Sequence, residues 1–126
     1  MPSRIWQSSS QRGQIVYTVS GALEVGTDLA FPFQPSGEFT ITEVFIICKV
    51  APTGAAILVD VNLNGVTIFT DQAGRPTIAD GALTGTSGTP DVIKLAKNDS
   101  LTIDVDQVVS GDTGEDMTIQ IRGTQP

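Results

Sequence analysis

Apolar and polar residues alternate with a period of two along most of this chain, and no segment keeps a helical period for three turns. The clearest runs are 15–25, 57–61, 101–105 and 117–121. Because neighbouring side chains on a strand point to opposite faces, each run predicts a strand with one buried face. The runs are separated by turns rich in Gly, Asn, Asp and Pro. The sequence therefore predicts seven to nine strands in an all-β antiparallel sandwich of jelly-roll or Greek-key type.

The length of 126 residues is that of one domain. We expect a single β-sandwich domain at 14–126, preceded by an extended polar N-terminal arm at 1–13. The arm contains Arg4, Trp6 and Arg12 but no acid. Two of the seven basic residues lie in it, so 14–126 holds five basic residues against all 14 acidic ones. Because Trp and Arg are common interface anchors, these three arm residues are predicted to bind a partner, with an idle tail as the equally weighted alternative.

Two irregularities are predicted within the strands. The apolar phase of 39–50 changes from odd to even positions near Thr42–Glu43, and a β-bulge there would keep one face buried. Gly21 lies inside the first long run, where a glycine often marks a second bulge.

Asn64-Gly65 predicts a two-residue hairpin, because a type I′ turn needs positive φ at both central positions. Pairing across this turn places Val61 opposite Ile68 inside the domain. The same register places Asp60 opposite Phe69.

The strand within 39–50 is apolar on both faces, because Phe45 and Ile47 occupy the positions between its inward residues. We expect these two side chains to contact another protomer. The connection from Gln72 to Pro90 is long and has one expected short strand at Thr77-Ile78, so we expect it also to meet a neighbour. Arg75 within it would bind an acidic partner or, as the favoured alternative, close the connection on Asp71 or Asp80.

Several function classes are disfavoured by what the sequence lacks. There is no histidine, which removes Ser-His and Cys-His catalysis, and no cofactor site is predicted. The single cysteine, Cys48, lies at an inward position and is expected to act as a small hydrophobe. A net charge of −7 disfavours nucleic acid and anionic membranes as partners. The N-terminus has no signal-peptide pattern, so we expect synthesis in a cytoplasm.

A calcium site is the one metal site that the residue types permit, since calcium takes oxygen ligands only. Asp104 and Asp106 share one strand face, and Asp112 and Asp116 lie in the next turn. These carboxylates would converge only if the turn folds back over the strand. The favoured alternative is that they are solvated and turn-forming acids, so no metal is predicted.

A carbohydrate-binding module is an alternative of another class. Such modules need exposed aromatic rings, and Trp6, which lies in the arm, is the only obvious candidate.

Six segments in order resemble a β-sandwich module of tailed-bacteriophage virion proteins, known from the C-terminal parts of minor tail proteins and from small virion proteins. The similarity runs from about Ile15 to Arg122. The segments are Val50-Ala-Pro-Thr-Gly54, Val59-Asp-Val-Asn-Leu-Asn-Gly65, Thr67-Ile-Phe-Thr70, Arg75-Pro-Thr-Ile-Ala-Asp-Gly81, Gly88-Thr-Pro-Asp-Val92 and Leu101-Thr-Ile-Asp-Val-Asp-Gln-Val108.

The resemblance implies a structural virion component, self-associating as a homotrimer, with no catalytic residues. A free-standing chain with its own arm fits a capsid decoration protein on the outside of the head better than a tail-fibre tip. The expected partners are therefore the major capsid protein or other virion proteins. A tail or baseplate appendage, including a receptor-binding component, is the alternative.

Overall fold

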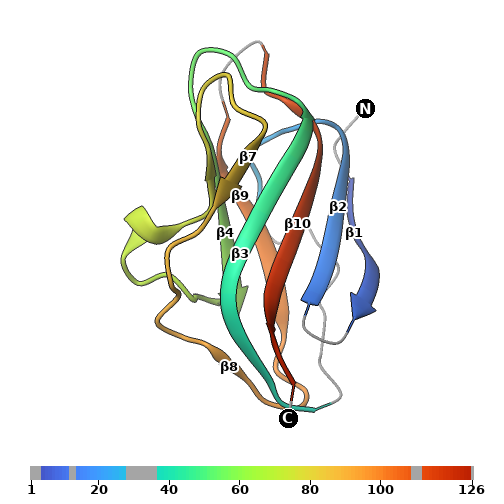
Figure 1. Cartoon of the computed structure of the whole chain (residues 1–126), viewed down its shortest axis with the longest axis vertical. Coiled ribbons are helices and arrows are strands. Elements are labelled where there is room, and N and C mark those ends of the chain that lie inside the picture. The colour runs from blue at the N-terminus through green and yellow to red at the C-terminus, as the bar shows by residue number, and fades with distance from the viewer. Residues whose placement is uncertain (1–3, 12–13, 28–36, 109–111, 126) are drawn as a thin grey trace.

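The computed structural model describes residues 4–11, 14–27, 37–108 and 112–125, the first of these ranges as backbone only. Two antiparallel sheets of six and four strands pack face to face (Figure 1). The predicted all-β sandwich is confirmed. None of the described residues belongs to a helix long and apolar enough to span a membrane.

The six-stranded sheet has the order β1-β2-β10-β3-β7, and the short β8 also pairs with β3. The last strand of the chain, β10, thus lies between β2 and β3. Only antiparallel pairings occur among these strands, which are β1 (Arg4–Gln11), β2 (Gln14–Ala22), β3 (Phe39–Val50), β7 (Thr84–Thr86), β8 (Lys94–Leu95) and β10 (Glu115–Thr124).

The four-stranded sheet is built around β4, which pairs with β9 on one side and with β5 and β6 on the other. Its strands are β4 (Ile57–Leu63), β5 (Val66–Thr67), β6 (Thr77–Ile78) and β9 (Leu101–Gln107). A 3-10 turn, η1 (Gln72–Gly74), lies between β5 and β6.

Both predicted bulges are present. The pairing of β3 with β10 shifts between Arg122 and Gly123, which leaves Thr42 as the extra residue on β3. The pairing of β2 with β10 shifts at Gly21, which has φ of +83° and whose N–H donates to the Asp116 carboxylate at 2.8 Å. Because the bulge at Thr42 absorbs one residue, Ile41 and Val44 on its two sides both stay on the buried face.

The predicted hairpin is confirmed in type and register. Asn64 and Gly65 have φ of +52° and +84°. Ile68 N–H donates to the Val61 carbonyl at 3.0 Å, so these two residues face each other as expected.

Ten strands form among the described residues, more than the seven to nine predicted. The expected strand at Thr77-Ile78 is present as β6, but β7 was not predicted because Thr84-Gly-Thr86 has no apolar residue. The second difference from the prediction concerns the N-terminal arm expected at 1–13. Its residues Arg4–Gln11 are extended but pair along β2 as an edge strand.

Both sheets contribute to one core. Among its largest fully buried side chains are Tyr17 of β2, Ile46 of β3, Ile57 of β4 and Phe69, which follows β5. Cys48 is 3% exposed among these residues, in agreement with its expected inward position.

We predict that the Cys48 thiol does not react in the native protein. Burial raises the pKa of this thiol, so its reactive thiolate is depleted as well as shielded. A disulfide reagent such as DTNB at pH 8 should label no thiol in the folded chain and one thiol per chain in guanidinium chloride. Rapid labelling of the folded chain would show that β3 opens locally.

Candidate binding face

The outward side of the six-stranded sheet carries regular rows of side chains, which we call the front face. The pairings align Thr18, Thr118, Ile47 and Thr84 in one row across β2, β10, β3 and β7. The parallel rows are Val16, Gln120, Phe45 and Thr86, then Gln14, Arg122 and Glu43. The front face therefore consists mainly of apolar and hydroxyl groups.

Arg122 is held on this face by three neighbours. Its guanidinium carbon lies 4.5 Å from the centroid of the Phe45 ring. Its Nη1 donates to Glu43 Oε1 and its Nη2 to Gln120 Oε1, both at 3.0 Å. The side chains of Arg122 and Glu43 remain 40% and 37% exposed. An arginine held over an aromatic ring yet open to solvent loses little side-chain entropy when a partner covers it.

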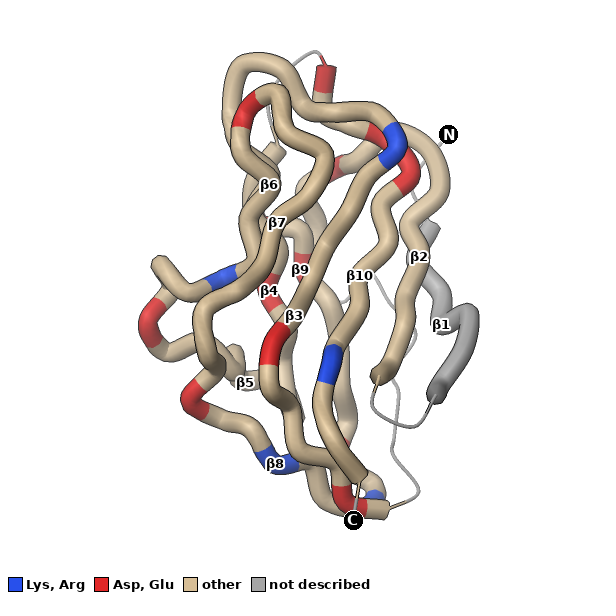
Figure 2. Tube along the Cα trace, in the orientation of Figure 1, with Lys and Arg blue, Asp and Glu red and all other residues tan. Residues whose placement is uncertain are grey.

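The front face is poor in charge. Figure 2 shows that the middle of β2, β3 and β10 is mostly uncharged, and the rows contain only the pair of Glu43 and Arg122 as ionic groups. Ile47 lies two rows away from this pair, beyond Phe45, and is 38% exposed. Large exposed aliphatic side chains in a charge-poor sheet face are typical of a surface that becomes covered.

The structure brings together part of the residues predicted to bind a partner. Phe45 and Ile47 both lie on the front face, and Trp6 of β1 is the register partner of Thr18 in the first row. Arg4 begins the same strand, whereas Arg12 lies outside the described residues. Arg122 was not predicted, because its proximity to Phe45 depends on pairing strands that are more than 60 residues apart in sequence.

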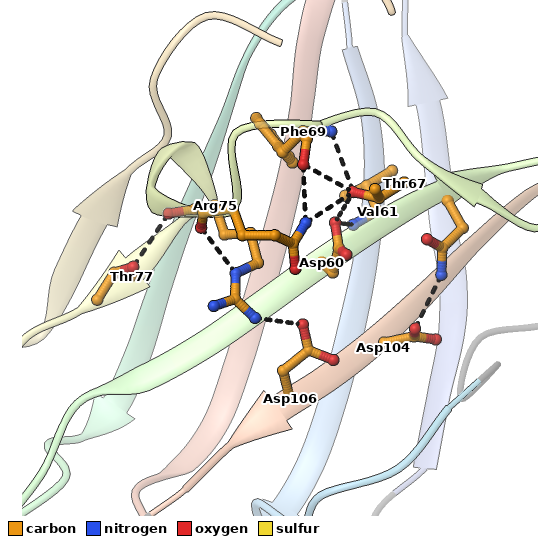
Figure 3. Close-up of polar contacts among 10 residues, drawn as sticks. Asp60, Val61, Thr67, Phe69, Arg75, Thr77, Asp104 and Asp106 are labelled. Atoms are coloured by element: carbon orange, nitrogen blue, oxygen red, sulfur yellow. Dashed lines mark hydrogen bonds and ion pairs between the residues drawn. The ribbon is translucent and has the colours of Figure 1, made fainter. Parts of the chain in front are cut away.

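The outward side of the four-stranded sheet is different and contains a polar network, drawn in Figure 3. Asp60 is only 5% exposed, and its Oδ1 accepts from Thr67 Oγ1 at 2.6 Å and from Val61 N–H at 2.8 Å. Gln72 Nε2 reaches from η1 to Thr67 Oγ1 at 3.3 Å and to the Phe69 carbonyl at 2.7 Å. The network attaches the connection after β5 to the sheet.

Asp60 is the residue of this network whose negative charge is least favourable in the fold. Its register partner on β9 is Asp104, and like charges opposite each other in a sheet are unfavourable. Burial above all, with the nearby Asp106 charge as a smaller cause, raises the pKa of Asp60.

We therefore predict that Asp60→Asn stabilises the protein in a pH-dependent way. Because the folded-state pKa of Asp60 is raised, its protonated form fits the fold best, and that benefit is lost as pH rises through the folded-state pKa. The amide keeps an acceptor for Val61 and Thr67. Urea unfolding should show wild type and variant equal below about pH 3.9, the ordinary aspartate value, and the variant more stable at pH 7. A less stable variant at pH 7 would show that the charge itself is needed.

Arg75 binds two groups of its own chain. Its Nη1 lies 2.8 Å from Asp106 Oδ2, and its Nε donates to the Gln72 carbonyl at 2.8 Å (Figure 3). The arginine thus closes the connection as the favoured alternative expected, but on Asp106 and not on Asp71 or Asp80. The predicted role of Arg75 in binding a partner remains a prediction.

The four calcium candidates have separate partners in the structure. Asp104 Oδ2 accepts from Asn62 at 2.8 Å, Asp106 pairs with Arg75, and Asp116 accepts from Gly21 in the other sheet. The exposed Asp112 accepts from Thr53 N–H through its main-chain oxygen. No cluster of three or more potential metal ligands forms within the described ranges.

One cavity of about 240 Å³ opens at the end of the sandwich where β8 meets β3. Its volume is below the usual range of ligand sites. The residues that line it are Glu38, Phe39, Thr40, Lys94, Leu95 and Ala96.

The described chain is thus a β-sandwich with one charge-poor face and one polar face. No protein-family model matches the sequence, and no curated protein matches it either. Among solved structures, the fold is similar to a chain of the cyanophage Pam1 capsid asymmetric unit, with a TM-score of 0.51 and 10% sequence identity. The alignment covers 100% of this chain and 88% of that chain. At this identity the similarity is one of fold.

Proposed function

We propose that this protein is a structural component of a bacteriophage virion that decorates and stabilises the outer surface of the head. It acts by binding and not by catalysis. The observation that carries the proposal is the fold similarity, over the whole chain, to a chain of a phage capsid asymmetric unit.

The sequence supports the same role in two ways. Six of its segments, taken in their order along the chain, resemble the tailed-phage sandwich module. The sequence also contains no histidine for acid–base or nucleophilic catalysis. The front face adds a surface suited to protein contact. A protein that binds only the assembled shell stabilises that shell by mass action, in proportion to its free concentration and affinity. In this proposal the decorating unit is a homotrimer at threefold positions of the shell, since closed cyclic symmetry is usual for such units.

The proposal is tested on phage particles that lack this chain. We expect quantitative mass spectrometry to find the protein in many copies on purified heads of the parent phage. Particles without it should release DNA at a lower temperature, and added purified protein should restore the parental value. Recovery of the protein on isolated tails would favour a tail or baseplate component. Specific micromolar binding on a glycan array would favour a carbohydrate-binding module.

The contribution of the N-terminal residues to head binding is tested by substitution. Deletion of 1–13 would also leave the β2 edge unpaired, because Arg4–Gln11 pair with it. Trp6→Ala and Arg4→Ala avoid this, and we expect each to weaken binding to heads without lowering the melting temperature of the free protein. Unchanged head binding by both variants would refute the contact.

A further inference from the structure

We infer that copies of this chain associate with one another through the front face. The inference rests on the proposed function, because it names how the decorating unit assembles. The occupant of the front face is a second copy of this chain, and the contact centres on Ile47, Phe45 and the Arg122–Glu43 pair.

Charge distribution selects this face for self-contact. The protein has a net charge of −7, so two copies repel each other over most approaches. On the polar face, Asp60, Asp104 and Asp106 are accompanied by one arginine, Arg75. The front-face rows balance one acid with one base. Two identical acidic bodies therefore meet at the lowest electrostatic cost when their front faces meet.

The front face is also large enough. The order β1-β2-β10-β3-β7 sets five strands side by side. At about 4.8 Å between strands and about 30 Å along them, the sheet face covers about 700 Å². A stable interface buries about 600 to 1,000 Å² on each partner, so the contact would use nearly the whole face.

The chemistry of the face is complementary to itself. Hydroxyl groups both donate and accept, so the threonines of one copy can bond to those of another. Arg122 and Glu43 lie on adjacent strands, so a rotation axis near them brings the arginine of one copy toward the glutamate of the next. The half-exposed Ile47 would lose its water contacts at the centre. A cyclic arrangement about such an axis, including the proposed trimer, satisfies all three conditions.

The first test measures the mass of the purified full chain in solution. We expect sedimentation velocity at micromolar concentration to show a concentration-dependent oligomer. Ile47→Asp should raise the dissociation constant of this oligomer at least tenfold. Val66→Asp is the matched control, because Val66 is 64% exposed and lies on β5 of the other sheet. It should associate as wild type does. Equal melting temperatures of dilute samples would show that both variants are folded.

The second test uses complementary charge variants. Glu43→Arg leaves two cations on the face and Arg122→Glu leaves two anions, so each variant alone should associate at least tenfold more weakly than wild type. An equimolar mixture of the two should associate more strongly than either alone, because unlike faces then meet. A simple loss of fold in each variant would not produce this recovery.

A wild-type chain that stays monomeric at about 100 μM, or a mixture no stronger than its components, would overturn the inference. The two proposals fail separately. A monomer that still binds and stabilises heads leaves the decoration role standing, whereas a front-face oligomer that never binds heads refutes that role and keeps the interface.

Discussion

Gly85→Ala should destabilise the fold by about 3 kcal/mol, although Gly→Ala changes usually stabilise a chain that tolerates them by about 0.4 to 1 kcal/mol. Gly85 lies in β7 opposite Ile46, where an edge of the six-stranded sheet approaches β6 of the other sheet. An added Cβ would overlap the main-chain carbonyl oxygen of Thr77. Since a backbone atom cannot turn aside as a side chain can, β6 and β7 would have to separate. The overpacking cost therefore exceeds the entropic gain.

The measurement is urea unfolding, with a melting temperature about 10 °C lower as the second readout. Gly37→Ala is the matched control, because its backbone φ is not in the left-handed region and an added Cβ there meets nothing within 4 Å. We expect that control to change the unfolding free energy by less than about 0.5 kcal/mol. If Gly85→Ala were as harmless as the control, β6 and β7 would not be in tight contact in solution.

The features that the sequence predicts correctly depend on neighbouring residues. The Asn64-Gly65 turn requires positive φ at both positions, and this fixes the hairpin register without any distant partner. The bulge at Thr42 follows from a change of apolar phase that one sheet face cannot otherwise accommodate. The outward position of Phe45 and Ile47 was predicted for the same reason, since they break the alternation of a strand whose other face is buried. Their contact with another protomer stays a prediction.

The features that were missed depend on pairings between distant strands. Arg122 has no distinguishing neighbours in sequence, and its position over Phe45 appears only when β10 enters the sheet beside β3. Arg75 was assigned to acids near it in the chain, whereas β9 brings Asp106 to it from 31 residues away. Distance along the chain therefore favoured the wrong partners for Arg75 and indicated none for Arg122, because a sandwich is closed by its non-local contacts.

Phe69→Ala should cost about 3 to 5 kcal/mol, a large part of the stability of a domain of this size. The Phe69 side chain is 1% exposed, so its loss removes a large buried surface and leaves a cavity. Its backbone is held on both sides, by Thr67 Oγ1 on its N–H at 3.0 Å and by Gln72 on its carbonyl. These bonds keep the truncated residue in place, so the surroundings can collapse only partly into the space. The midpoint of urea unfolding should fall accordingly.

The comparison of three substitutions separates the ring from the polar network around it. Phe69→Leu keeps most of the buried volume and should cost less than about half as much as Phe69→Ala. Val66→Ala, in the same hairpin but 64% exposed, should change the unfolding free energy by less than about 0.5 kcal/mol. A cost for Phe69→Ala no greater than that of Val66→Ala would mean that hydrogen bonds alone hold the connection after β5. With the expected order, the buried ring is the main anchor, and the polar network only fixes the path of a segment that hydrophobic burial already holds against the sheet.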